Sequence, residues 1–568
     1  MANEEPEVKL ERFLQWLQVN NVELRGCKIK YCGENKGFGI FSSDQVSDGV
    51  LLVVPLDLAI TPMRVLQDPL LGPECRAMFE EGEVDDRFLM ILFLTVERLR
   101  KNSSWKPYFD MLPSTFGNPL WFTDDELLEL KGTTLHRATE LQKLKLLSLY
   151  DEQVKGLVKK LLLLDGNSES EVSFEDFLWA NSIFWTRALN IPLPHSYVFP
   201  QIQEDQDNCG SVNKSYVFTD QSKELVNEQE EKGDGFLVVG GEVREVNGIT
   251  STSLQSETLW VEGLVPGIDF CNHDLKAAAT WEVDGTGSVT GVPYSMYLLS
   301  VGKCSPVQDG EEISISYGNK GNEELLYLYG FVIDDNPDDY LMVHYPLEAI
   351  QSIPNSDTKA VLLEAQTAEL RCLLPKSLLD HGFFPPHECN NKCKTGPICD
   401  FSWSGQRRMP SYSNKLVFPE SFLAALRTIA MKQDEHLKVS SLLEELVGPG
   451  GERQPSDTEV RAAVWEASGD SGALQLLLDL LNTKLMDLEE NSGTEKCDSE
   501  LLQKTSTERL GQHACYENNS SKETNGSTTP TQKHKWMSIV YRRGQKELAR
   551  LFLREAEYAL QLALSEGN

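Results

Sequence analysis

An amide and an imidazole stand side by side in the stretch DFCNHD, at Asn272 and His273. Phe270 and Cys271 come just before them, so the polar pair lies in an apolar frame. Two interpretations are open: a buried, hydrogen-bonded pair with a structural role, or a pair that holds a ligand. The pair alone does not decide between them, and the choice depends on motifs elsewhere in the chain.

Two glycines, Gly37 and Gly39, occur in the stretch NKGFGIF. Glycine has no Cβ, which lets the backbone approach a ligand closely. A dinucleotide-binding fingerprint would read G-x-G-x-x-G and lead into a helix. Position 42 is Ser42 and the neighbouring residues favour a strand, so the fingerprint matches poorly and a plain β-turn is the alternative.

Four potential zinc ligands gather in the stretch HECNNKCKTGPICDF, namely His387, Cys389, Cys393 and Cys399. The cysteines are separated by three and then five residues, unlike the paired C-x2-C spacing of zinc knuckles. We therefore expect a loop of reduced thiols and no metal site.

Two carboxylates, Asp269 and Asp274, flank the Asn-His pair and resemble an acid–base pair. We expect Asp269 to act as a structural hydrogen-bond acceptor instead. No Ser-His-Asp, P-loop or kinase signature is convincing anywhere in the sequence.

The chain has 568 residues and a formal net charge of −34, which disfavours binding to nucleic acid or anionic membranes. The charge is compatible with a basic protein partner, although solvated acidic faces would also account for it. Twelve scattered cysteines suggest a reduced, intracellular protein, and MANEEPEVKL has no signal-peptide core. The longest apolar run, at 88–96, falls short of the ~20 residues that a membrane span needs. We expect a cytoplasmic or nuclear location, with a chloroplast left open.

The pattern of apolar residues predicts an N-terminal helix over 8–19, strands at GFGIF and VLLVVP, and helices from 62 to 190. One of these helices opens with a capping box at Ser173 and Asp176. Residues 201–257 read as a flexible acidic insert with one short hairpin. Strands return over 260–317, where GEEISISYG alternates. We therefore expect two distant β-rich stretches, 22–61 and 258–333, to form one domain.

The pattern after residue 336 is mainly helical, with a leucine stripe from Leu474 to Leu488 and a strong helix from Trp536. Residues 491–532 are rich in Ser, Thr, Asn and Glu, which predicts a disordered linker.

The motifs NKGFGIF, DFCNHD and GEEISISYGNKGNEELLYLYGF occur in this order. Together they resemble the SET-domain methyltransferases, in the branch of the Rubisco large-subunit lysine methyltransferase and the actin-histidine methyltransferase, and a plant member is our expectation. The resemblance covers about 22–335 and extends more weakly over 336–568, where YRRGQKELARLFL supports it.

The resemblance implies an α+β fold: a split β-rich SET domain with a helical insertion, followed by a mostly helical C-terminal domain. The implied divisions are an N-terminal helix at 1–21, a SET domain at 22–335 and a Rubisco-methyltransferase-like substrate-binding domain at 336–568. Within the SET domain the helical insertion spans about 62–200.

The resemblance also assigns a binding site for S-adenosyl-L-methionine (SAM), with no metal. It implies that Asn272 holds the methionine end of SAM and that His273 offers its main chain to the adenine. The family's glycine turn around the methionine moiety matches Lys36, Gly37, Phe38 and Gly39.

Arg187, in FWTRAL, matches the arginine that pairs with the SAM carboxylate in the family. Without the resemblance, a surface arginine at a helix C-terminus would be the simpler interpretation. The family often has Phe two residues later, where this chain has Leu189.

Tyr317 matches the family's catalytic tyrosine, which also borders the SAM site, and Tyr329 matches a second active-site tyrosine. A core aromatic ending a strand is the alternative for Tyr317. Tyr327 competes with Tyr329, because the spacing from Tyr317 is about one residue shorter than in the Rubisco enzyme. Phe331 is expected to pack beneath the site.

The implied function is SAM-dependent N-methylation of a lysine side chain, with histidine as a second acceptor, on a protein substrate. The alternative is a catalytically silent SET-fold protein that docks a partner through its C-terminal helices. We expect a monomer that binds neither nucleic acid nor membrane.

Overall fold

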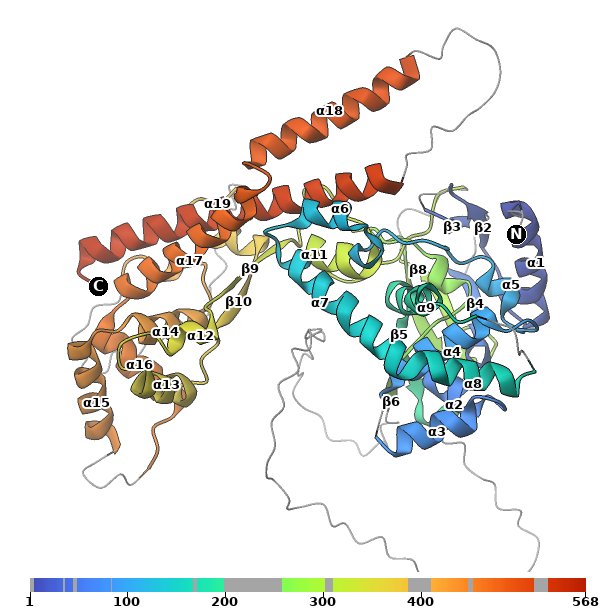
Figure 1. Cartoon of the computed structure of the whole chain (residues 1–568), viewed down its shortest axis with the longest axis horizontal. Helices are drawn as coiled ribbons and strands as arrows, with labels where there is room; N and C mark the ends of the chain where they lie inside the picture. The colour runs from blue at the N-terminus through green and yellow to red at the C-terminus, as the bar shows by residue number, and fades with distance from the viewer. Residues whose placement is uncertain are drawn as a thin grey trace, which may run out of the picture.

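The structure is a computed structural model that describes residues 5–33, 36–43, 49–82, 84–166, 171–198, 258–301, 310–386, 410–447, 453–514 and 530–568. Figure 1 shows a lobe of strands and helices that contains the N-terminus and a mainly helical lobe beside it. The long C-terminal helix runs along both lobes. The predicted acidic insert and the Cys/His loop that begins at His387 lie outside the described residues.

The strands of the first lobe come from two distant segments of the chain. A four-stranded antiparallel sheet has the order β1-β4-β8-β7, and two further antiparallel pairs of strands, β2-β3 and β5-β6, form two-stranded sheets. Their bounds are β1 (Glu23–Leu24), β2 (Cys27–Tyr31), β3 (Phe38–Ser42), β4 (Val50–Pro55), β5 (Leu189–Pro194), β6 (Thr258–Gly263), β7 (Ala279–Asp284) and β8 (Ser295–Ser300). Because β4 pairs with β8, for example Val53 with Tyr297, the predicted split β domain is confirmed.

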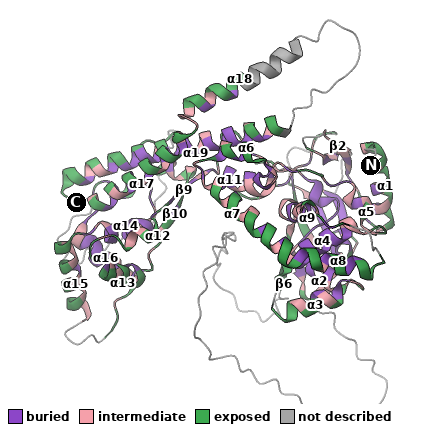
Figure 2. Cartoon of the chain, viewed as in Figure 1, coloured by how far each residue is buried: buried purple, intermediate pink, exposed green. Residues whose placement is uncertain are grey.

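Helices fill the segment between the two β-rich stretches and pack against the strands in one large core. Figure 2 shows buried residues concentrated where α4 and α9 meet the strands. The helices of this lobe up to β6 are α1 (Pro6–Val19), α2 (Pro62–Gln67), α3 (Gly72–Glu80), α4 (Asp86–Leu99), α5 (Lys106–Phe109), α6 (Asp124–Leu127), α7 (Thr134–Leu149), α8 (Lys155–Leu164), α9 (Phe174–Arg187) and α10 (His195–Val198).

Helix α9 starts and ends where the sequence indicates. At its start the Ser173 hydroxyl accepts a hydrogen bond from the Asp176 N–H at 3.2 Å, and the Asp176 carboxylate accepts one from the Ser173 N–H at 3.1 Å. This is the predicted capping box. Ala188 is extended, so the helix ends at Arg187 and places that side chain at its C-terminus.

The stretch GEEISISYG departs from the predicted strand. Its alternation is confirmed, since Ile313 and Ile315 are buried while Ser316 is exposed. It makes only isolated bridges, of Glu312 with Phe41 and of Ile315 with His273. Because it passes from one partner segment to another, no two consecutive residues share a partner and no regular ladder forms. The segment continues into α11 (Asn322–Glu324) and a π-helical turn, η6 (Leu325–Tyr329).

The second lobe packs helices around a two-stranded antiparallel ribbon. The predicted leucine stripe is confirmed, because Leu474, Leu477, Leu481, Leu485 and Leu488 are all buried. The elements are β9 (Tyr340–His344), β10 (Arg371–Pro375), α12 (Leu347–Ile350), α13 (Ser356–Ala365), α14 (Glu420–Ala430), α15 (Gln433–Val447), α16 (Asp457–Ser468), α17 (Ser471–Glu490), α18 (Glu495–Ala514) and α19 (Pro530–Glu566).

The disordered linker predicted over 491–532 is contradicted where α18 forms, at Glu495–Ala514, while residues 515–529 lie outside the described residues. Asp498 on this helix is fully buried and accepts hydrogen bonds from Lys546 Nζ at 2.6 Å and Arg542 Nε at 2.8 Å. These cations lie on α19, so a long-range ion network orders a segment whose composition alone favours disorder. Among the described residues, no helix combines the length and apolar character that crossing a membrane requires.

Candidate functional site

The glycine turn joins β2 to β3. Gly37 has a φ of +70°, which favours glycine, and its carbonyl accepts a hydrogen bond from the Cys32 N–H at 2.7 Å. Gly39 meets a different constraint, because a Cβ there would lie 3.0 Å from Cys32 Sγ and 3.3 Å from Glu312 Oε1. The backbone at Gly39 is therefore packed closely against the stretch that contains Glu312.

Glu312 connects this turn to the Asn-His pair. One carboxylate oxygen lies 3.0 Å from Lys36 Nζ, and the other accepts a hydrogen bond from Asn272 Nδ2 at 2.6 Å. Residues predicted from separate motifs are thus brought together in one place. Glu312 is not among the predicted site residues, and the signal for it in the sequence is its position on the face of GEEISISYG opposite to Ile313 and Ile315.

The main chain around His273 is held by the parallel bridge to Ile315. Asn272 O accepts from the Ile315 N–H at 3.0 Å, and the Asp274 N–H donates to Ile315 O at 3.2 Å. In a parallel bridge the central residue turns its own N–H and C=O to the other side. No described residue bonds to the N–H or C=O of His273, so both are available to a ligand.

The His273 ring is fixed by the main chain of Tyr317, whose N–H donates to Nδ1 at 3.1 Å. Burial lowers the pKa of this imidazole, which favours the neutral ring with its proton on Nε2. The ring lies 5.2 Å from that of Tyr317 and 5.9 Å from that of Phe331, measured between centroids. His273 thus contributes its main chain and one wall of an aromatic cluster.

Arg187 reaches the site from the end of α9. Its Nη1 donates to the carbonyl oxygen of Asp269 at 2.7 Å, and its guanidinium lies 5.3 Å from the centre of the Phe270 ring. Its Nε is buried and has no hydrogen-bond partner among the described residues. The group is therefore held in place on one side and has a free donor on another.

The Asp269 side chain is a structural acceptor, as predicted. It accepts hydrogen bonds from the hydroxyl of Tyr108 and from the Gly267 N–H, the latter at 3.1 Å. Burial raises the pKa of this carboxyl to about 6, although the nearby Arg187 guanidinium lowers it. Because both of its oxygens face protein donors, Asp269 fixes the backbone that carries Phe270 and positions Arg187.

Three aromatic rings form one cluster next to the Asn-His pair. The ring of Tyr317 lies 4.9 Å from that of Tyr329, and the ring of Phe331 lies 6.3 Å from that of Tyr329. The Tyr317 hydroxyl donates to Cys271 O at 2.8 Å. Tyr327 instead packs against a separate apolar cluster that includes Leu326 and Met537. Tyr329, and not Tyr327, is therefore the partner of Tyr317.

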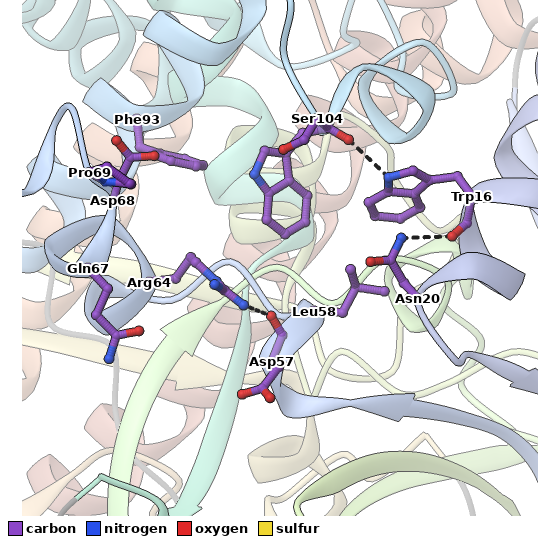
Figure 3. A pocket seen from close by; sticks show the side chains of 11 residues that line it. Trp16, Asn20, Asp57, Leu58, Arg64, Gln67, Asp68, Pro69, Phe93 and Ser104 are labelled. Atoms are coloured by element: carbon purple, nitrogen blue, oxygen red, sulfur yellow. Dashed lines mark hydrogen bonds between the residues drawn. The ribbon is translucent and has the colours of Figure 1, made fainter.

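A separate hollow of about 290 Å³ opens between α1, α2 and the turn before α5. Figure 3 shows it lined by the rings of Trp16 and Phe93 and by polar groups such as Asn20 and Arg64. Arg64 donates to the carbonyl of Asp57, and Trp16 Nε1 donates to Ser104 O. None of the predicted site residues lines this hollow.

All nine predicted site residues lie in the described part of the chain, and the contacts above connect the turn, the Asn-His pair, Arg187 and both tyrosines. Within the described ranges, no group of three His, Cys, Asp or Glu side chains is placed to hold a metal ion. The site offers a guanidinium, a carboxylate-bound amide, free main-chain polar groups and an aromatic wall. Such a set suits a ligand with charged and aromatic parts.

No family model matches the chain. Curated relatives that are similar to it include the chloroplastic ribulose-1,5 bisphosphate carboxylase/oxygenase large subunit N-methyltransferase of Pisum sativum, 26% identical over 63% of this chain and 59% of the relative. A ribosomal lysine N-methyltransferase of Schizosaccharomyces pombe is 24% identical over 62% and 52%. The actin-histidine N-methyltransferase of Canis lupus familiaris is 28% identical over 58% and 44%. The match thus spans less than two thirds of the length of each of these relatives.

Two solved structures have a similar fold. The SET domain of LSMT bound to lysine and AdoHcy has a TM-score of 0.58 at 19% identity, covering 98% of this chain and 92% of that chain. Rubisco LSMT bound to AdoMet has a TM-score of 0.56 at 18% identity, covering 97% and 92%. The predicted resemblance and fold class are confirmed. The plant origin stays a prediction, because the relatives come from plants, yeast and mammals.

Proposed function

We propose that this chain, which resembles the Rubisco and actin branch of SET-domain methyltransferases, is a SAM-dependent protein N-methyltransferase that acts on lysine. The observation that carries the proposal is the contact of Glu312 with both Lys36 and Asn272. That contact joins the glycine turn to the Asn-His pair beside Tyr317. The relatives named as lysine and histidine N-methyltransferases, and the neighbours bound to AdoMet or AdoHcy, support the same activity.

Arg187 is the proposed ligand for the α-carboxylate of SAM. Its Nε is a buried donor with no described partner, which costs free energy unless a ligand accepts from it. A carboxylate suits a guanidinium because it can accept two parallel hydrogen bonds. The bond from Nη1 to Asp269 O keeps the group oriented before the ligand arrives. A buried Arg187 Nε that lacks a partner among the described residues is therefore suited to an anionic ligand.

The remaining parts of SAM are assigned to the Asn-His pair and the glycine turn. The N–H and C=O of His273, to which no residue in the described ranges bonds, offer one donor and one acceptor, which suits the edge of an adenine ring. Asn272 is the proposed ligand for the methionine end. Gly37 and Gly39 allow the backbone to come close to this end, with Lys36 and Phe38 beside them.

When bound, SAM supplies an electrophilic methyl group for in-line transfer to a neutral nitrogen. A lysine with a reference pKa of ~10.4 is neutral in fewer than about one in a thousand molecules at pH 7. The rings of Tyr317, Tyr329 and Phe331 provide an apolar surround that disfavours the ammonium form and lowers that pKa. These rings prepare the acceptor and hold it in line.

The two phenols orient the acceptor and do not take its proton. Burial raises the pKa of Tyr329 to about 12 and raises that of Tyr317 as well, so both keep their protons at neutral pH. Tyr317 is held by its hydrogen bond to Cys271 O, and its oxygen retains a lone pair for the methyl hydrogens. A histidine acceptor has a reference pKa of ~6.5 and needs little of this help, so the effect of the aromatic surround on the acceptor's pKa matters chiefly for lysine.

The substrate is a protein, and we propose that its acceptor lies in a basic segment, because the chain carries a net charge of −34. The helical second lobe is the proposed docking platform. We further propose that the protein is a monomer located in the cytoplasm or nucleus.

Calorimetric titration with SAM, beside a radiomethyl assay, tests the function. Tyr317→Phe is expected to retain SAM binding and to lose turnover by about 100-fold, because a positioned oxygen is removed. Tyr327→Phe is the matched control, since its ring packs in a different cluster, and it is expected to keep turnover. Unchanged turnover in Tyr317→Phe removes this residue from the mechanism. A wild-type protein that binds no SAM refutes the proposal and favours the partner-docking alternative.

A further inference from the structure

We propose that Glu312 is a positioning residue that fixes the orientation of the Asn272 amide, so that the amide oxygen is presented to the ammonium group of the methyl donor. The inference rests on the proposed function and concerns how the donor's methionine end is recognised.

Glu312 is itself held firmly in place. The residues on either side of it bond to β3: the Ser42 N–H donates to Glu311 O at 2.9 Å, and the Ile313 N–H donates to Ile40 O at 2.7 Å. Its side chain is mostly buried, with 26% of it exposed. Each oxygen has its own partner, Lys36 Nζ on one and Asn272 Nδ2 on the other. The carboxylate is thus fixed in both position and rotation.

An ionised carboxylate only accepts hydrogen bonds, whereas a primary amide has a donating end and an accepting end. At 2.6 Å from Glu312 Oε1, the amide of Asn272 must turn its NH2 group toward the carboxylate. Its oxygen, Oδ1, then faces the opposite side. No described residue donates to Oδ1, so Glu312 leaves a free acceptor at this end of the site.

This arrangement separates the two charged groups of an α-amino acid. Arg187 offers a guanidinium with a free N–H, which suits a carboxylate. Asn272 Oδ1, with the negative charge of Glu312 behind it, suits an ammonium. A glutamine in place of Glu312 has both a donor and an acceptor, so it would allow the Asn272 amide to adopt either orientation. The site would then lose its preference for a donor that carries the ammonium.

The test compares two ligands that share an adenosine but differ in the amino acid part. S-adenosylhomocysteine carries the ammonium and carboxylate, and 5′-methylthioadenosine lacks both. Glu312→Gln is expected to weaken S-adenosylhomocysteine binding by about tenfold, the value of one charge-linked hydrogen bond. Binding of 5′-methylthioadenosine should stay within about twofold of wild type, because this ligand has no ammonium and only small indirect effects of the substitution reach it. Glu311→Gln, the same change on the exposed neighbouring side chain, is the matched control and should alter neither affinity.

A second variant keeps the test informative if the single change disturbs folding. In Asn272→Asp/Glu312→Gln, the new aspartate accepts from the new glutamine and still presents an oxygen to the ammonium, so S-adenosylhomocysteine binding should recover. Equal loss for both ligands in Glu312→Gln, no loss for either, or no recovery in the double variant overturns the inference. If the wild-type protein binds neither ligand, the proposed function is refuted together with the inference. If the wild-type protein binds the ligands and the variants give one of the results above, the inference alone is refuted.

Discussion

Arg187→Lys is the change that most directly probes donor recognition outside the aromatic cluster. Lysine keeps the positive charge but has no planar fork, so it can make one point contact where arginine makes two parallel ones. In the structure Arg187 Nη1 is already engaged with Asp269 O at 2.7 Å, while its buried Nε has no hydrogen-bond partner among the described residues. A lysine ammonium that keeps the bond to Asp269 O is drawn away from the donor's carboxylate.

The expected loss follows from this geometry. One hydrogen bond to a charged group contributes about 1.5–3 kcal/mol, and the charge that lysine retains places the loss at the lower end of this range. We therefore expect the Kd for S-adenosylhomocysteine to rise by about 10- to 30-fold. The free energy of unfolding should fall by only about 1 kcal/mol, because the main-chain contact can be remade.

Isothermal titration at fixed ionic strength, with a thermal melt of each variant, measures both quantities. Arg98→Lys is the control, because Arg98 bonds to Asp176 at 3.1 Å and lies 4.2 Å from the Trp179 ring, away from the site residues. It should lower the melting temperature without changing donor affinity. An Arg187→Lys protein that binds the donor within about twofold of wild type refutes the assignment of Arg187 to the carboxylate.

Three further predictions concern packing and charge. Gly39→Ala should weaken donor binding and cost about 1–3 kcal/mol of stability, because the new methyl group lies 3.0 Å from Cys32 Sγ; unchanged calorimetric titrations would contradict it. Asp284→Asn should lower the free energy of unfolding by about 1–2 kcal/mol at pH 7 in urea titrations. Although burial opposes ionisation, hydrogen bonds from Thr290 and Val289 lower the pKa of Asp284 to about 2. The stabilisation by this carboxylate is therefore present above about pH 4 and is lost as the pH falls toward 2. A difference in free energy of unfolding between wild type and Asp284→Asn that persists at pH 2 would refute this. Asp498→Asn should cost about 3 kcal/mol, because it leaves the buried Lys546 without its counter-charge; denaturation midpoints equal to wild type would rule out that role.

Elements with a strong local pattern could be predicted from the sequence. The apolar run VLLVVP forms β4, the Ser173 capping box starts α9, and the leucine stripe of α17 is buried. Each depends on residues within a few positions of one another, where periodicity and capping rules apply. The order of the three motifs along the chain supported the further prediction that two distant segments belong to one β domain.

What the sequence did not reveal depends on contacts between distant segments. Glu312 is positioned by contacts with Lys36 and Asn272, which are far from it in the sequence. Asp498 is likewise held by Lys546, which lies on another helix. The sequence favoured Tyr329 but left Tyr327 open as a competitor, and the packing of the two rings distinguishes them: Tyr329 lies 4.9 Å from Tyr317, whereas Tyr327 packs in a separate apolar cluster. The irregular pairing of GEEISISYG likewise follows from the two segments on either side of it.

The central claim is that the glycine turn, the Asn-His pair and Tyr317 form one methyl-transfer site. The most direct measurement is incorporation of labelled methyl groups from SAM into a fractionated proteome, followed by mapping of the modified residue. We predict label on a lysine side chain of a protein with the wild-type chain and almost none with Tyr317→Phe. Equal labelling by the two proteins, or none by a folded wild type in any fraction, would contradict it.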